Sequence, residues 1–140
     1  MASGRLGQRQ LMALERVLNE LRRENLKRVV LLHHPPQQGA EPWRKALHDA
    51  QDFREVIARS GAELILHGHK HKPLRAALRG PEGLAVPVFG AGSASHKNAA
   101  HYHVFDLSSD GWQVLHRRCN KETRQFETVA EEKASFGETL

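Results

Sequence analysis

Two groups of histidines are the residues of this sequence best suited to chemistry. His33 and His34 stand directly before two prolines, and His67, His69 and His71 alternate within one short segment. Neutral imidazoles bind zinc, manganese, iron and related ions. Two histidines separated by one residue in an extended loop can point to a common side, and the glycine before His69 lets the backbone turn tightly. The sequence therefore predicts a metal site formed by His33, His69 and His71.

Both histidine groups follow segments that we expect to be buried strands. The expected strands, residues 27–32 and 63–66, each contain a short apolar run without alternation, which is typical of parallel strands covered on both faces. In open α/β sheets, ligands bind outside the carboxyl ends of the strands. We therefore expect both histidine groups to lie at one edge of a sheet.

Helical patterns flank these two strands. Leucines recur at helical spacing between residues 11 and 21, and Asn25 is expected to end that helix. Asp49 is expected to cap a second helix, which ends at Gly61 and turns Phe53, Val56 and Ile57 toward the core. The order of helix, strand, helix and strand predicts the α/β class with a parallel pair of strands.

Beyond Pro73 the pattern changes to short strands separated by turns. We expect an antiparallel meander whose strands are residues 74–78, 85–89, 101–107 and 112–117. Its clearest turns are residues 81–83 and 108–111, the second with an Asp-Gly pair. The polar and acidic stretch from residue 130 is expected to fray. We expect one partial domain over residues 1–128 and a polar C-terminal tail over residues 129–140.

The histidine blocks carry a family resemblance. Residues 29–36, Val-Val-Leu-Leu-His-His-Pro-Pro, and residues 66–71, Leu-His-Gly-His-Lys-His, resemble the last two metal-binding blocks of calcineurin-like metallophosphoesterases. The resemblance covers nearly the whole chain. It implies the C-terminal half of an αββα sandwich and a hydrolase of phosphomono- or phosphodiesters. It also implies two divalent metal ions, which are Mn, Fe or Zn in that family.

The resemblance assigns a role to each histidine of the two blocks. His33 and His69 would bind one ion together, and His71 would bind the other. His34 would pack or hydrogen-bond beside the site. His67 would orient the ligands, although a buried histidine at a strand end explains it equally well.

The other histidines are expected to be ordinary surface or partly buried residues. The glycine- and serine-rich loop over residues 90–95 is interpreted as a flexible turn at the rim of the site. Its amides, or His96 beside it, are a candidate contact for a substrate phosphate. The remaining histidines receive no role: His48, His101, His103 and His116.

The carboxylate half of the family's site is missing from this sequence. The Asp-x-His, Gly-Asp and Gly-Asn-His-Asp/Glu blocks are absent, and Asp49 and Asp52, the nearest acids after the first histidine block, match no such motif. Two cations at close range need a bridging carboxylate. The catalytic residues are therefore unassigned, and one ion or none remains open. A truncated frame, a short paralogue and one member of a complementing or self-associating pair also remain open.

Composition narrows the functional classes. The net charge of +5 over 140 residues suits a phosphate-bearing substrate, and a non-catalytic metal-binding scaffold is the alternative to a hydrolase. A nucleic-acid-binding module ranks last, because basic residues are dispersed and aromatic residues make up 6%. Cys119 is the only cysteine, no apolar run reaches ~18 residues, and no signal peptide is expected. We expect a soluble, cytoplasmic protein.

Overall fold

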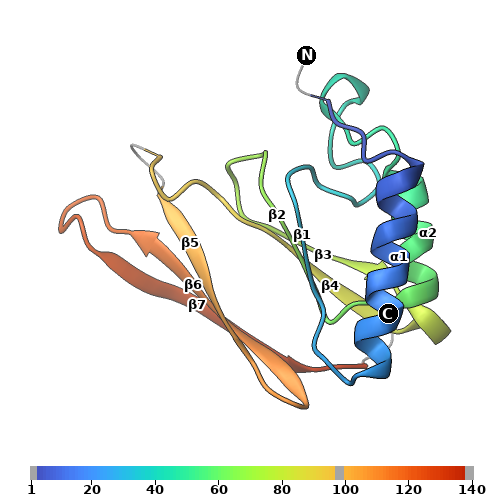
Figure 1. Ribbon diagram of the computed structural model, residues 1–140. Coiled ribbons are helices and arrows are strands. Elements are labelled where there is room, and N and C mark those ends of the chain that lie inside the picture. Colours follow the sequence, from blue (N-terminus) through green and yellow to red (C-terminus); the bar gives the residue numbers. More distant parts are fainter. Residues whose placement is uncertain (1–2, 97–99, 138–140) are drawn as a thin grey trace.

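The computed structural model describes residues 3–96 and 100–137, which form two helices and two sheets (Figure 1). Residues 97–99 and both chain ends lie outside the described part. The helices and strands, with two short 3-10 turns, are α1 (Gln8–Arg23), β1 (Val29–Leu32), η1 (Trp43–Lys45), α2 (Ala50–Ser60), β2 (Leu64–His67), β3 (Leu74–Arg79), η2 (Pro81–Gly83), β4 (Ala85–Gly90), β5 (His101–Leu107), β6 (Gly111–Cys119) and β7 (Phe126–Ser135).

The first sheet confirms the α/β class and the parallel pair. Its strand order is β1-β2-β4-β3, with β1 parallel to β2 and β2 parallel to β4. The expected single meander is wrong, because β3 and β4 form a hairpin that joins this first sheet. Only β5, β6 and β7 form a separate antiparallel meander within the described residues. The physical reason lies in β4, where every residue from Val86 to Gly90 is buried, as a strand covered on both faces requires.

The helices cover one face of the first sheet. Leu11 and Leu18 of α1 and Phe53 and Ile57 of α2 are buried against sheet residues such as Ile65. The amphipathic pattern in the sequence therefore identifies the buried faces of both helices correctly. None of the helices in the described part of the chain is long and apolar enough to cross a membrane.

Asp49 occupies the N-cap position of α2, as expected, but its side chain makes no capping hydrogen bond there. Its carboxylate instead accepts hydrogen bonds from the backbone N–H groups of Leu6 at 3.0 Å and Gly7 at 2.7 Å. These bonds connect the chain before α1 to the start of α2. A carboxylate can satisfy any nearby backbone donor, so the short sequence distance to α2 did not decide its partners.

The second core lies between the two sheets. Leu64 and Phe89 of the first sheet are buried against Trp112 and Val114 of β6. Arg75 of β3 lies over the Phe89 ring at 4.4 Å, and its guanidinium bonds to a carboxylate of β7, Glu132, at 3.1 Å. Arg75 therefore connects β3 to β7 across the inter-sheet core.

Strand β1 is the open edge of the first sheet. Residues 27–32 were expected to be covered on both faces, but only Val30 of β1 is fully buried. Leu31 is 73% exposed and Val29 is 39% exposed, because the second sheet does not extend over β1. That expectation is therefore wrong, and an apolar strip lies in solvent beside the inter-sheet core.

Strand β7 occupies much of the stretch that was expected to fray. It runs from Phe126 to Ser135 in antiparallel register with β6, across the expected boundary between residues 128 and 129. Its side chains are mostly exposed, which explains the misleading polar pattern. Cross-strand bonds hold it, including Gln113 to Glu131 at 2.6 Å and Arg117 to Thr128 at 2.9 Å.

Candidate functional site

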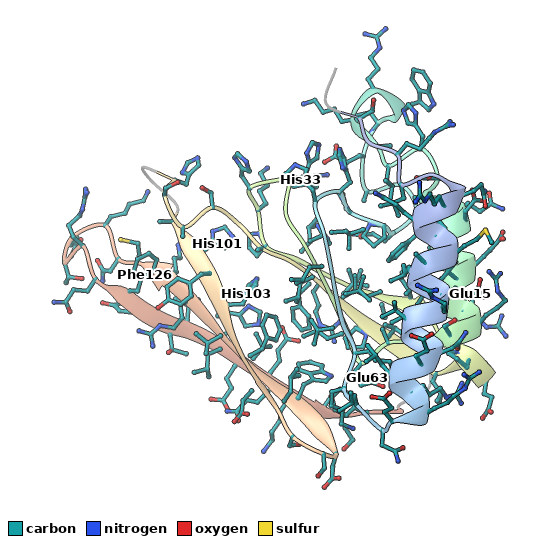
Figure 2. All side chains as sticks on the ribbon, in the orientation of Figure 1. Glu15, His33, Glu63, His101, His103 and Phe126 are labelled. Carbon is teal, nitrogen blue, oxygen red and sulfur yellow. The ribbon has the colours of Figure 1, made fainter. Side chains whose placement is uncertain are left out.

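Three histidine rings gather at the carboxyl ends of β1 and β2. The centroid of the His33 ring lies 5.1 Å from those of His34 and His69, and the His34 and His69 rings are 4.6 Å apart. The register of the parallel pair places Leu32 opposite His67, so both strands end at the same edge of the sheet. We call His33, His34 and His69 the strand-end cluster; Figure 2 labels His33 within it.

The closest pair in the strand-end cluster has a separation that suits two metal ligands. His33 Nε2 and His69 Nδ1 are 3.1 Å apart. Two imidazole nitrogens bound to one tetrahedral zinc ion lie roughly 3.3 Å apart, given Zn–N bonds of about 2.05 Å. Without an ion, one nitrogen donates a proton to the other.

The backbone after β2 carries the turn that brings His69 to His33. Gly68 donates its N–H to the His33 carbonyl oxygen at 3.1 Å, and Lys70 donates to the Gly68 carbonyl oxygen at 2.9 Å. The left-handed residues of this loop are His69 and His71, with φ values of 70° and 53°. Gly68 has ordinary φ, so the expectation that the glycine makes the tight turn is wrong. Non-glycine residues held with positive φ cluster at functional sites.

His69 remains neutral near pH 7. Partial burial, followed by the neighbouring His34, lowers the pKa of His69, while Glu41 acts in the opposite direction. The neutral imidazole is the form that binds metal ions. Glu41 itself pairs with Lys70 at 3.6 Å, and the same ammonium donates to the Ala40 carbonyl oxygen. These contacts connect the loop before η1 to the loop that carries His69.

His71 lies elsewhere. Its exposed side chain lines a cavity of about 400 Å³ together with His101, His103 and His116 of the second sheet. Across the described residues, no group of three or more His, Cys, Asp or Glu side chains is arranged to hold a metal ion. The structure therefore brings His33 and His69 together but leaves His71 apart, and the metal roles of all three remain predictions.

No role was expected for His101, His103 and His116, yet the fold brings them together. His101 and His103 are two residues apart on β5 and share a face, and His103 pairs directly with His116 across the β5–β6 ladder. The ring centroids of His103 and His116 are 4.7 Å apart. The Asp-Gly turn predicted at residues 108–111 already fixes this pairing register. That turn was the signal that could have identified the group.

The other predicted site residues are placed less directly. The His34 ring packs on Gly4, where an added Cβ would lie 2.6 Å from Cε1. His67 is 3% exposed, and its Nδ1 lies 3.1 Å from the Gly68 carbonyl oxygen. His96 has an exposed side chain, and its N–H donates to the Ser93 carbonyl oxygen at 3.3 Å. Their roles beside the site stay predictions.

Comparisons with known proteins assign no family to this chain. No protein-family model matches this sequence, and no curated protein matches it. Among solved structures, a single mutant of Vps29 from Entamoeba histolytica is similar, with 14% sequence identity and a TM-score of 0.46. The alignment covers 78% of this chain and 55% of the Vps29 chain, so this chain spans little more than half of that protein's length.

Proposed function

We propose that this chain is the histidine-bearing half of a metal-dependent hydrolase of phosphomono- or phosphodiesters. One observation carries the proposal: His33 Nε2 and His69 Nδ1 converge to 3.1 Å at the carboxyl ends of two adjacent parallel strands. This edge is where open α/β sheets bind their ligands. The order of the two histidine blocks supports the same reading.

The donor set suits divalent Mn, Fe or Zn. His33 and His69 would hold one ion, and His71 would hold the second after its exposed side chain turns from the inter-sheet cavity. When bound, a pair of such ions supplies the Lewis acidity that phosphoester hydrolysis needs. The chain's own contribution is to hold neutral imidazoles at a fixed separation, which the lowered pKa of His69 supports.

A second polypeptide segment is needed to complete the centre. The acid whose charge acts on His69 is Glu41, but it pairs with Lys70 at 3.6 Å, so the bridging carboxylate would come from outside the described residues. The open edge of β1 and its exposed Leu31 provide a place for an added strand. We propose that a complementing segment or a second copy pairs near this edge and brings acidic ligands to His33 and His69.

The test is hydrolysis of bis(p-nitrophenyl) phosphate with added Mn²⁺. The full chain is compared with His69→Ala, which removes one of the converging nitrogens. His48→Ala is the matched control, because His48 stacks on Trp43 outside the strand-end cluster. We expect turnover that His69→Ala abolishes and His48→Ala preserves. Turnover that survives His69→Ala contradicts the proposal.

The same experiment also tests the alternative hypothesis, that the chain is a non-catalytic scaffold. A folded chain that binds one metal ion per copy, or none, and shows no turnover with any of the three metals is a scaffold. Metal content measured on the protein after gel filtration supplies that count.

A further inference from the structure

The loop after β2 contains a three-residue turn with His69 at its centre. The N–H of Lys70 donates to the Gly68 carbonyl oxygen at 2.9 Å, and His69 has a φ of 70°. A hydrogen bond that closes three residues, with positive φ at the middle one, defines the form of the γ-turn that is rare and strained. Such strain persists only where the surrounding structure imposes the conformation. The contacts around Gly68 must therefore hold this turn in place.

Gly68 is held through both of its backbone groups. Its N–H donates to the His33 carbonyl oxygen at 3.1 Å, which connects the turn to the end of β1. Its carbonyl oxygen lies 3.1 Å from His67 Nδ1. A carbonyl oxygen only accepts hydrogen bonds, so this nitrogen of His67 carries the proton. The same oxygen has two lone pairs and accepts from His67 and from Lys70. His67 therefore fixes the acceptor that closes the turn.

The His67 ring is itself fixed by the first sheet. His67 is the last residue of β2, is 3% exposed, and stands in register between Leu32 of β1 and Gly90 of β4. Its carbonyl oxygen accepts a hydrogen bond from the Ala91 N–H at 2.7 Å. Its Cε1 would lie 2.7 Å from a Cβ added at Gly90, so the ring packs closely on that glycine. The donor to the turn is therefore held by regular strand pairing and close packing.

Packing alone does not account for a histidine at this position. The Nε2 of His67 is buried and has no hydrogen-bond partner among the described residues. An unpaired acceptor in the interior is destabilising, and a leucine of similar volume would fill the same space without one. The contact that an apolar side chain cannot supply is the hydrogen bond from Nδ1 to the Gly68 carbonyl oxygen. That bond is therefore the reason for the imidazole.

We propose that His67 is a positioning residue, which presents His69 to His33 by donating its Nδ1 proton to the Gly68 carbonyl oxygen. His67 stays outside the set of metal ligands and acts through the turn, which sets the separation of 3.1 Å between His33 Nε2 and His69 Nδ1. Groups that orient metal ligands raise the affinity of the site. The expected effect on affinity rests on the metal site of the proposed function, whereas the bond from His67 and the turn need no ion.

The test compares two substitutions of His67 by Zn²⁺ affinity, measured by competition with a fluorescent chelator. His67→Leu keeps the volume and removes the donor. In His67→Asn the side-chain amide nitrogen takes the place of Nδ1 and can donate to the Gly68 carbonyl oxygen. We expect His67→Leu to weaken Zn²⁺ binding by about tenfold or more, and His67→Asn to stay within about threefold of the unchanged chain.

The matched control is His103→Leu. His103 also has a ring nitrogen beside a backbone carbonyl oxygen, that of Gly90 at 3.3 Å, but it stands on the second sheet. This variant should keep the Zn²⁺ affinity of the unchanged chain. Equal Zn²⁺ affinity in His67→Leu and the unchanged chain overturns the proposal, and so does an equal loss of affinity in His67→Leu and His67→Asn.

A purely structural role for His67 predicts that stability and Zn²⁺ affinity fall together. We instead expect the urea midpoint of His67→Leu to equal or exceed that of the unchanged chain, because the substitution removes an unpaired buried acceptor. A loss of affinity accompanied by a matching loss of stability therefore assigns His67 a structural role and overturns the proposal.

Two measurements without metal separate this inference from the hydrolase proposal. NMR of the ring nitrogens in the unchanged chain should show the His67 proton on Nδ1, and a proton on Nε2 overturns the inference. Amide hydrogen exchange at Lys70 should be faster in His67→Leu than in the unchanged chain, and equal exchange overturns it as well. An unchanged chain that binds no Zn²⁺ contradicts the proposed function, and these two measurements then decide the role of His67. If His67→Leu does not fold, the position of the His67 proton decides.

Discussion

The two histidine groups of this protein are built in opposite ways. The strand-end cluster of His33, His34 and His69 sits on loops where β1 and β2 end, and its geometry depends on a left-handed backbone at His69. His103 and His116 instead stand on regular paired strands, and the packed sheets place them. The first group depends on local backbone conformation and the second on tertiary packing. Substitutions should therefore affect the two groups differently.

The largest expected effect is a loss of stability in the inter-sheet core, which places His103 and His116 but not the strand-end cluster. Phe89 is 1% exposed, and its ring lies about as far from His103 as from His116, at 6.2 Å and 6.3 Å between centroids. We expect Phe89→Ala to lower the free energy of unfolding by about 3–5 kcal/mol, because it empties a closely packed site. Urea denaturation followed by tryptophan fluorescence measures this loss. A change below about 1 kcal/mol would show that the sheets are not held by this core.

Between these two groups, only substitutions in the strand-end cluster are expected to weaken the binding of metal ions. His69→Ala should weaken Mn²⁺ or Zn²⁺ binding by more than about 100-fold, a larger loss than substitutions outside the ligand set cause. His103→Phe should leave that affinity within about threefold of the unchanged chain. Competition with a fluorescent chelator measures both. Equal losses in the two variants would remove the distinction between the groups.

Glycine substitutions sharpen the comparison further. An added Cβ at Gly90 would lie 2.7 Å from the His67 ring and 2.8 Å from the Leu74 Cβ, so Gly90→Ala should destabilise the fold by about 1–3 kcal/mol. At Gly68 the nearest atom, in the His33 ring, is 3.8 Å away. Gly68→Ala should change stability by less than about 0.5 kcal/mol. Thermal unfolding of the two variants measures this difference in stability. A larger loss in Gly68→Ala than in Gly90→Ala would contradict the prediction.

Lowering the pH should reduce the free energy of unfolding through His103, which lies between the two sheets. Because burial lowers the pKa of His103 in the folded chain, the unfolded chain takes up a proton first as the pH falls. The free energy of unfolding should therefore decrease below about pH 6.5, the ordinary histidine pKa, and level off once the folded-state pKa is passed. Urea midpoints at pH 5.5 and 7.5 measure the decrease. In His103→Phe the decrease should be smaller, and an unchanged decrease would assign it to other groups.

Much of the first sheet could be predicted from local sequence, because the information was local. The apolar run before His33 and the helical spacing of Leu11 and Leu18 each depend on one short segment. The exposure of Leu31 could not be predicted in this way, since it depends on which strands lie beside β1. The same holds for β7, whose polar residues concealed a strand held by backbone pairing to β6.

The same distinction between local sequence and tertiary packing applies to the candidate site. The convergence of His33 and His69 was expected because parallel strands end at one edge of a sheet. The separation of His71 was not, because it depends on positive φ at two histidines, a conformation that their residue type only weakly favours. The grouping of His101, His103 and His116 required the register of a hairpin together with the packing of two sheets.

The open edge of β1 limits how two copies of this chain could complete one another. Symmetric pairing of a strand with its own copy across a two-fold axis is antiparallel. Antiparallel pairing points the two β1 strands in opposite directions, so the two strand-end clusters would lie at opposite ends of the joined sheet. A four-residue strand spans roughly 13 Å, whereas paired catalytic ions lie about 3.5–4 Å apart. A dimer formed by pairing β1 with its own copy therefore cannot merge the two clusters into one centre, and carboxylates that reach His33 must come from a segment other than β1, in a second copy or in another chain.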